Sequence, residues 1–141
     1  KTEVNSLHSG VARDSLGPGG LVAIGTSLDP AMTKSDSLLG NVIGKPGTLP
    51  PVWNKFSVEA KLLDRVVGTK NIQDMDELKT KEPLMITVGT RTTVGIPITV
   101  RENIVDINLT IPVCAPIGQR IALSRRVDGK WHLIGYGIIK E

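Results

Sequence analysis

The sequence predicts an all-β protein built from antiparallel β-barrels. Its 15 glycines and 9 prolines interrupt a chain of 141 residues at short intervals, as in proteins with many turns. Hydrophobic residues make up 40% of the chain but aromatic residues only 3%, so a core must consist mainly of Val, Ile and Leu. These apolar residues alternate with polar ones in several segments, which is typical of strands with one buried face.

The first 47 residues are expected to form an incomplete barrel. Apolar runs predict strands at residues 2–7, 21–25 and 40–44, with polar loops at 8–20 and 29–37. Small closed barrels need about five to eight strands, so three strands cannot close one. A stiff, proline-rich connector follows at residues 45–51. We therefore place a domain boundary there, which gives domains 1–47 and 48–141.

The second domain contains about six predicted strands, enough for one complete barrel. In the strand 56–62, Phe56, Val58, Ala60 and Leu62 alternate with polar residues. Further strands are expected at 84–89, 94–101 and 104–111, and in a hairpin over 120–138. Pro97 indicates that its strand lies at an edge or contains a bulge. The charged segment 68–82 is expected to be an exposed loop with one helical turn near 74–78.

The last hairpin turns at Asp128-Gly129, a dipeptide suited to a type I′ turn. Counting outward from this turn pairs Val127 with Lys130, Arg126 with Trp131, Arg125 with His132 and Leu123 with Ile134. This register places Ile121, Leu123, Ile134, Tyr136 and Ile138 on one face. It also favours a cation–π pair between Arg126 and the ring of Trp131.

Charge and cysteine content restrict the environment only loosely. The net charge of +3 and the pI near 9.2 suit an ordinary solvated surface and an RNA-facing one about equally. The single cysteine, Cys114, lies in an apolar run and is expected to be buried, which fits a reducing cytosol. No apolar run approaches the roughly 18–20 residues of a membrane span, and no membrane partner is expected. The start at Lys1, without a methionine, fits a fragment of a longer protein.

No sequence signature of a catalytic, nucleotide or metal site is present. The glycines at 17, 19 and 20 are not followed by the Lys-Ser/Thr of a phosphate-binding loop. His8, His132 and Cys114 lack the spacing of metal ligands. No serine lies in a G-x-S-x-G motif. We therefore expect this chain to be no enzyme and to hold no cofactor or metal. The rival hypothesis is a small standalone β-barrel enzyme, whose turnover a single Ser or His substitution would abolish.

The first candidate binding surface is the basic end of the last hairpin, which comprises Arg120, Arg125, Arg126, Lys130 and His132. Several cations on one surface, arginines among them, suit phosphate recognition. The alternative is a solvated hairpin end with a salt bridge to Asp128. Because aromatic residues are few, RNA binding here would be directed at the backbone and sensitive to salt.

The second candidate surface is the polar loop 29–36, read DPAMTKSD. Asp29 and Ser35 can accept backbone hydrogen bonds, so local capping explains the loop as well as a role in docking another protein does.

Several blocks resemble the gamma subunit of archaeal and eukaryotic translation initiation factor 2. They are PGGLVAIGTSLDP (18–30), TKSDSLLG (33–40), LLDRVVG (62–68), IPVC (111–114) and IALSRRVDGKWHLIGYG (121–137). The resemblance implies β-barrels of the translational GTPase type. Domain 1–47 would be the C-terminal half of the middle barrel, and domain 48–141 the complete C-terminal barrel. Elongation factor Tu and the selenocysteine-specific factor have equivalent barrels and remain alternatives.

The resemblance also implies a function and partners. Proteins of this family bind GTP with magnesium and, with alpha and beta subunits, carry initiator methionyl-tRNA to the small ribosomal subunit in the cytoplasm. This chain would be a non-catalytic barrel region, with GTP and magnesium held by a GTPase domain outside it.

Three sets of site residues follow from the resemblance. Glu3, Gly19, Gly20, Leu21 and Ala23 would form part of the wall that receives the tRNA acceptor end. The loop that docks the alpha subunit would comprise Asp29, Pro30, Thr33, Lys34 and Asp36. Arg125, Arg126, Lys130 and His132 would face RNA.

Overall fold

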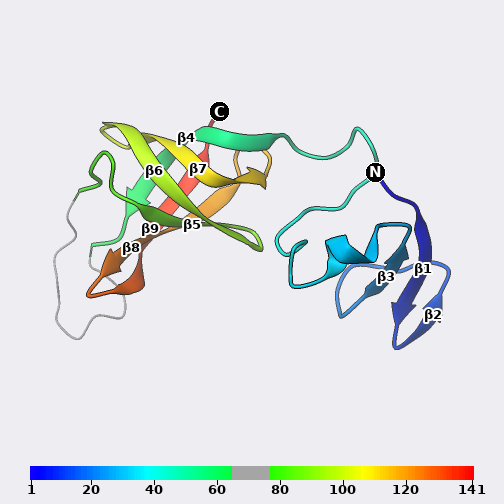
Figure 1. Ribbon diagram of the computed structural model, residues 1–141. Helices are drawn as coiled ribbons and strands as arrows, with labels where there is room; N and C mark the ends of the chain where they lie inside the picture. Colours follow the sequence, from blue (N-terminus) through cyan, green and yellow to red (C-terminus); the bar gives the residue numbers. More distant parts are fainter. Residues whose placement is uncertain (65–76) are drawn as a thin grey trace. The chain divides into compact units, whose positions relative to one another are not determined.

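The computed structural model describes residues 1–64 and 77–141, and the chain forms two compact units, Lys1–Leu38 and Leu39–Glu141. Figure 1 shows strands in both units, with one short 3₁₀ helix, η1 (Pro30–Thr33), as the helical element in the described part of the chain. The all-β prediction is therefore confirmed. The boundary predicted between residues 47 and 48 falls inside the second unit, in the segment before its first strand, and stays a prediction.

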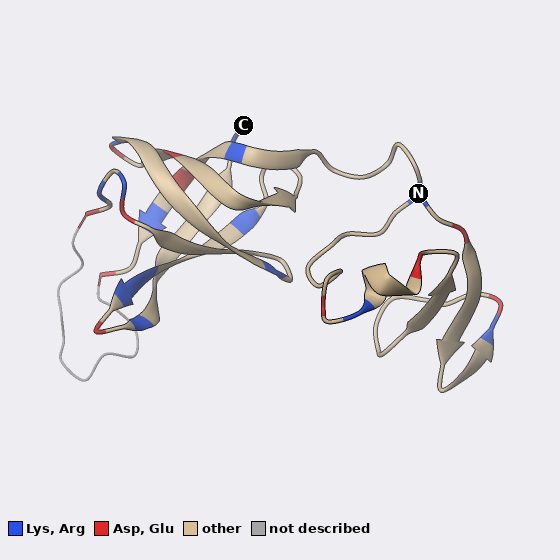
Figure 2. Cartoon of the chain, in the orientation of Figure 1, with Lys and Arg blue, Asp and Glu red and all other residues tan. Residues whose placement is uncertain are grey.

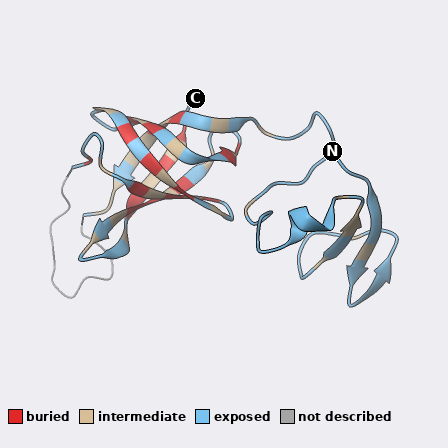
Figure 3. Ribbon diagram, viewed as in Figure 1, coloured by how far each residue is buried: buried red, intermediate tan, exposed pale blue. Residues whose placement is uncertain are grey.

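The first unit is a three-stranded antiparallel sheet in the order β2-β1-β3. Its strands are β1 (Val4–Ser9), β2 (Val11–Arg13) and β3 (Ala23–Thr26). None of its residues, all of which the structure describes, is buried, as the pale blue and tan ribbon of Figure 3 shows. Leu21 is 91% exposed and Val11 is 58% exposed. An open sheet without a core confirms that this barrel is incomplete.

Two predictions about the first half of the chain are wrong. Residues 11–13 were expected in a loop but form β2, because Gly10, at φ +75°, makes a tight turn that folds Val11 back onto Ser9. Residues 40–44 were expected to form a strand but are a turn followed by irregular chain. Gly40 has a φ of +75°, and the described residues provide no strand that pairs with Val42 and Ile43.

The second unit is a closed six-stranded antiparallel barrel, as predicted. Its strands are β4 (Val52–Leu62), β5 (Leu84–Val88), β6 (Arg91–Arg101), β7 (Ile104–Cys114), β8 (Arg120–Val127) and β9 (Lys130–Ile139). Their order is β4-β7-β6-β5-β8-β9, and pairing of β9 with β4 closes the barrel. Inward-facing Val, Ile and Leu side chains surround Phe56, which is 1% exposed. Figure 3 shows this core as the red bands along the strands.

The final hairpin matches its predicted register only near the turn. Asp128 and Gly129 both have positive φ, 49° and 79°, as a type I′ turn requires. Leu123, however, pairs with Gly135 and not with Ile134, because a bulge shifts the register between Leu123 and Ser124. Beyond this bulge the alternation reverses, so Tyr136 and Ile138 are only partly buried, while Gly137 and Ile139 are buried.

Three other local predictions have mixed outcomes. Pro97 does adjoin a bulge, since the pairing of β6 with β7 shifts between Pro97 and Thr99. Cys114 is half-buried and not buried, and its Sγ lies 3.3 Å from the carbonyl oxygen of Pro50. Most of the helical turn predicted at 74–78 lies outside the described residues.

Asp106 on β7 lies among groups that lower the pKa of its carboxyl group. The hydroxyl group of Ser57, its pairing partner on β4, donates a hydrogen bond to Asp106 Oδ1. This bond lowers the pKa most, the charges of Lys55 and Arg101 lower it further, and burial opposes them. A lowered folded-state pKa stabilises the fold above the ordinary pKa, and this contribution is lost as the pH falls through the folded value.

Replacing Ser57 with alanine is expected to raise the pKa of Asp106 towards its ordinary value, because the largest cause of the shift is removed. A ¹³C NMR titration of the carboxyl groups measures this directly. The stability difference between the two proteins should shrink as the pH is lowered through the folded-state pKa. Asp106→Asn identifies the resonance, and an unchanged titration in the Ser57→Ala variant would contradict the assignment.

Candidate nucleic-acid interface

Lys and Arg residues lie on both strands at the turn end of the β8–β9 hairpin, and Figure 2 colours these positions of the ribbon blue, next to a red acidic position in the turn. The predicted pairs of Arg126 with Trp131 and Val127 with Lys130 are both present. Arg126 and Lys130 are exposed to solvent. Because successive residues alternate between faces, Arg126 and Lys130 lie on opposite faces of the hairpin, where a bound strand can contact both by passing around its end.

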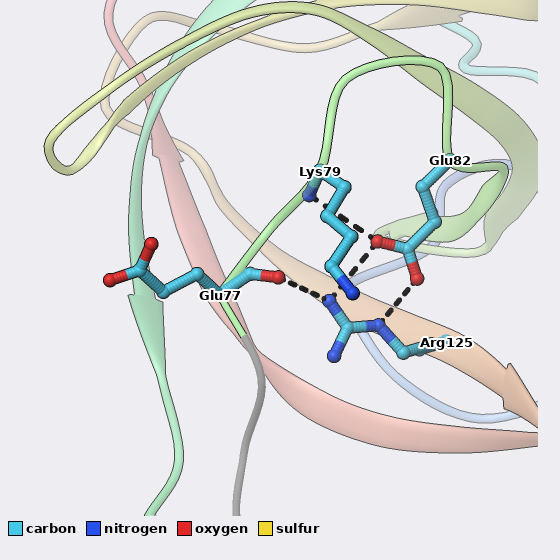
Figure 4. A network of polar contacts seen from close by, with 4 residues as sticks. All are labelled: Glu77, Lys79, Glu82 and Arg125. Carbon is cyan, nitrogen blue, oxygen red and sulfur yellow. Dashed lines mark hydrogen bonds and ion pairs between the residues drawn. The ribbon is translucent and has the colours of Figure 1, made fainter.

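Arg125 has a different role from its neighbours. It pairs with the buried Leu84 of β5, and its side chain is only 12% exposed. Its Nε lies 2.5 Å from Glu82 Oε1, and its Nη2 donates to Glu82 Oε2 (3.1 Å) and to the carbonyl oxygen of Glu77 (2.9 Å). Figure 4 shows these contacts, together with the backbone amide of Lys79 pointing at the same carboxylate. Arg125 therefore holds the turn 77–82 against β8.

Arg120 and His132, the remaining cationic residues of the hairpin, also differ in position. Arg120 pairs with Ile138 at the opposite end of β8, and its guanidinium lies 4.6 Å from the ring centroid of Tyr136. In the described part of the chain, this pair is the cation–π contact, and the one predicted for Arg126 and Trp131 is not formed. His132 pairs with Arg125 and is half-buried. The exposed cations at the hairpin end are therefore Arg126 and Lys130.

The residues predicted to receive the tRNA acceptor end lie at both ends of one strand pair. Glu3 precedes β1, and its carbonyl oxygen accepts a hydrogen bond from Ser27. Ala23 pairs with His8, at the other end of the β1–β3 ladder. His8 follows Glu3 by five residues of extended chain, so about 17 Å separates the two ends. Gly19, Gly20 and Leu21 lead into Ala23, so the structure groups these residues with it and not with Glu3.

The loop predicted to dock another subunit is ordered by its own hydrogen bonds. Asp29 caps η1, and its side chain accepts a 2.8 Å bond from the amide of Ala31. Thr33 Oγ1 donates to the carbonyl oxygen of Pro30, the first helical residue. The capping expected of Asp29 is therefore confirmed. Further along the loop, the hydroxyl group of Ser37 donates to the carbonyl oxygen of Lys34. Ser35 has a positive φ of 52°.

The same loop presents its charges to solvent. Lys34 and Asp36 are exposed, as is Met32 at 51%. A self-capped turn with exposed side chains is a preformed surface, and local capping and docking are therefore compatible.

Sequence reasoning missed a cavity on the outer face of the barrel. Glu82, Pro83, Val94, Arg126 and Trp131 line a space of about 280 Å³. These residues come from β6, β8, β9 and the segment before β5, which adjoin in the barrel but are far apart in sequence. Only the Arg126–Trp131 pair carried a local signal, through the hairpin register.

Two further findings concern the described residues alone. They include no group of three His, Cys, Asp or Glu side chains placed to hold a metal ion. Nor do they include a helix with the length and apolar character needed to cross a membrane.

Comparison with known proteins identifies similar sequences over nearly the whole chain. Residues 54–139 match the family model described as "Initiation factor eIF2 gamma, C terminal". Translation initiation factor 2 subunit gamma of Methanothermobacter thermautotrophicus is 57% identical over 96% of this chain and 35% of its own length. The proteins of the same name from Methanocaldococcus jannaschii and Halobacterium salinarum are 54% and 48% identical, over 87% and 99% of this chain. The chain thus spans about a third of the length of these curated relatives.

Proposed function

Because this chain belongs to the family of the gamma subunit of translation initiation factor 2, we propose that it serves the delivery of initiator methionyl-tRNA to the small ribosomal subunit. The chain corresponds to a non-catalytic barrel region of the factor. Its part in delivery would be to dock partners, while GTP and magnesium are bound outside this chain, by the GTPase domain of the parent protein. The proposed setting is the cytoplasm.

The observation that carries this proposal is the match of the closed barrel to the family, combined with the exposed cations at its hairpin end. Arg126 and Lys130 are exposed and lie on either side of the hairpin turn, so they can contact neighbouring phosphates. The relatives named above are initiation factors, which disfavours elongation factor Tu and the selenocysteine-specific factor.

We propose distinct surfaces for the partners. The hairpin end would face tRNA or ribosomal RNA, with Arg126 and Lys130 as the contact residues. The self-capped loop around η1 would dock the alpha subunit, and Gly19, Gly20, Leu21 and Ala23 would contribute to the tRNA acceptor-end wall. The beta subunit would assemble through the parent protein.

Replacing Arg126 and Lys130 together with alanine is expected to weaken RNA binding and reduce its salt dependence. Each lost phosphate contact reduces the magnitude of the negative slope of log K against log salt by about 0.7–0.9, so the loss of two contacts reduces it by about 1.4–1.8. Fluorescence anisotropy of labelled initiator tRNA and of a small-subunit ribosomal RNA fragment, measured with the full chain at 50–200 mM salt, checks this.

The matched control removes the same charge elsewhere. Lys45 and Lys61 are both exposed and lie in the connector and on β4, away from the hairpin end, so their double alanine variant should retain most of the slope. Equal slopes for the two double variants would refute a specific RNA surface at the hairpin end.

A further inference from the structure

Trp131 lies on the outer face of β9, and its side chain is 38% exposed. It pairs with Arg126 of β8 and lines the cavity with Val94 of β6 and with Pro83, just before β5. The strands β6, β5, β8 and β9 are consecutive neighbours in the barrel, so their outer faces form a continuous floor beneath this cavity.

The lining is mainly apolar and carries one available positive charge. Pro83, Val94 and the indole ring supply the apolar walls. The carboxylate of Glu82 is already paired with Arg125. Within the described residues, the side chain of Arg126 makes one hydrogen bond, from Nε to the carbonyl oxygen of Gly129 (3.3 Å). Its terminal amines are therefore available to a ligand beside the ring.

The size of the cavity suits one small group. Pockets for drug-sized ligands measure roughly 300–1,000 Å³, and this one, at about 280 Å³, lies just below that range. An exposed indole offers a flat face on which any nucleobase can stack. A cation beside it suits the phosphate attached to the same nucleotide.

We propose that this cavity holds one unpaired base of RNA, stacked on Trp131, with its phosphate on Arg126. This inference rests on the proposed function, in which the hairpin end faces RNA, and it adds a nucleotide-binding site to what was expected to be a backbone contact alone. Lys130, on the other face of the turn, contacts the next part of the strand. RNA is favoured over a protein segment because the two exposed cations of this end, Arg126 and Lys130, outnumber its one exposed anion, Asp128, and because an exposed indole ring lies beside Arg126.

Fluorescence of the full chain tests the stacking. The chain has two tryptophans, and Trp53 is half-buried, with Nε1 donating to the carbonyl oxygen of Ala115 (2.8 Å). In a Trp53→Phe variant, whose fold is verified by circular dichroism, emission comes from Trp131 alone. Decauridylate and decaadenylate RNA are expected to quench it on binding.

Substitution of Trp131 measures the contribution of stacking. Stacking on an aromatic ring is worth about 1–3 kcal/mol per base, so Trp131→Ala should weaken binding of either oligonucleotide about 5- to 150-fold. Trp131→Phe should recover part of this loss. The slope of log K against log salt should not change, because the phosphate contacts remain.

The outcomes separate this inference from the proposed function. Binding with normal salt dependence, but without quenching and without loss in Trp131→Ala, overturns the stacking site and leaves the RNA surface standing. Absence of RNA binding at 50 mM salt overturns both. A shift of Trp131 emission by a (Leu-Glu)₅ peptide, with none by either oligonucleotide, assigns the cavity to a protein segment and refutes the inference.

Discussion

Replacing Arg125 with alanine is expected to destabilise the barrel by about 3 kcal/mol. Breaking a buried ion pair costs about 3–5 kcal/mol, because one charge remains without its partner, and the lower end applies since the two side chains retain 12% and 22% exposure. The variant also loses stability through a second contact, because the carbonyl oxygen of Glu77 loses its hydrogen-bond donor. The turn 77–82 would then detach from β8 and uncover Leu78, which is 9% exposed.

Urea unfolding monitored by Trp53, which packs against the barrel core, measures the change in the free energy of unfolding. Two controls separate a lost partner from a lost side chain. Arg126→Ala, at the exposed neighbouring position, should change stability by less than about 0.5 kcal/mol. The double variant Arg125→Met and Glu82→Met should recover most of the loss, because apolar groups of similar volume replace both charges. If the double variant is as unstable as Arg125→Ala, the ion pair is not the cause.

This arginine also shows what the sequence can predict. Its pairing with His132 follows from counting three residues to either side of the Asp128-Gly129 turn, and that prediction is correct. Its partner Glu82 is 43 residues away in sequence, and nothing local distinguishes Arg125 from Arg126. The contrast between an inward and an outward arginine becomes visible only when β5 is placed beside β8.

The bulges define a second limit. Period-two patterns located all six strands of the barrel, because each strand presents one face to a common core. The same patterns fail where an extra residue enters a strand, as at Ile134, since a bulge depends on where β9 must meet both β8 and β4. In the sequence, Pro97 itself indicated the nearby bulge, whereas an isoleucine at position 134 gives no indication of one. Binding surfaces predicted from the residues alone were likewise limited to neighbours along one loop or across one hairpin, which is why the cavity at Trp131, lined from four parts of the barrel, was not foreseen.

Replacing Gly135 with alanine is expected to give one of the largest losses of stability of any conservative change in this barrel. Gly135 pairs with Leu62 at the contact of β9 with β4, which closes the barrel. A Cβ atom there would collide with the backbone carbonyl oxygen of Lys61 and lie 2.9 Å from Cα of Leu62. Backbone atoms cannot rotate away as a side chain can, so the strands must separate. We expect a cost of about 3 kcal/mol, the upper end for overpacking.

For a domain of this size the cost corresponds to a fall in Tm of about 12–24 °C, measurable by circular dichroism. Gly137→Ala is the matched control, because it makes the same change two residues further along β9. Its added Cβ would meet Cγ1 of Ile121 and Cβ of Val58 at 3.2 Å, contacts that need shifts of only a few tenths of an ångström. It should cost about 1 kcal/mol, the lower end for overpacking. Equal falls in Tm for the two variants would show that contact with the β4 backbone is not what excludes a side chain at position 135.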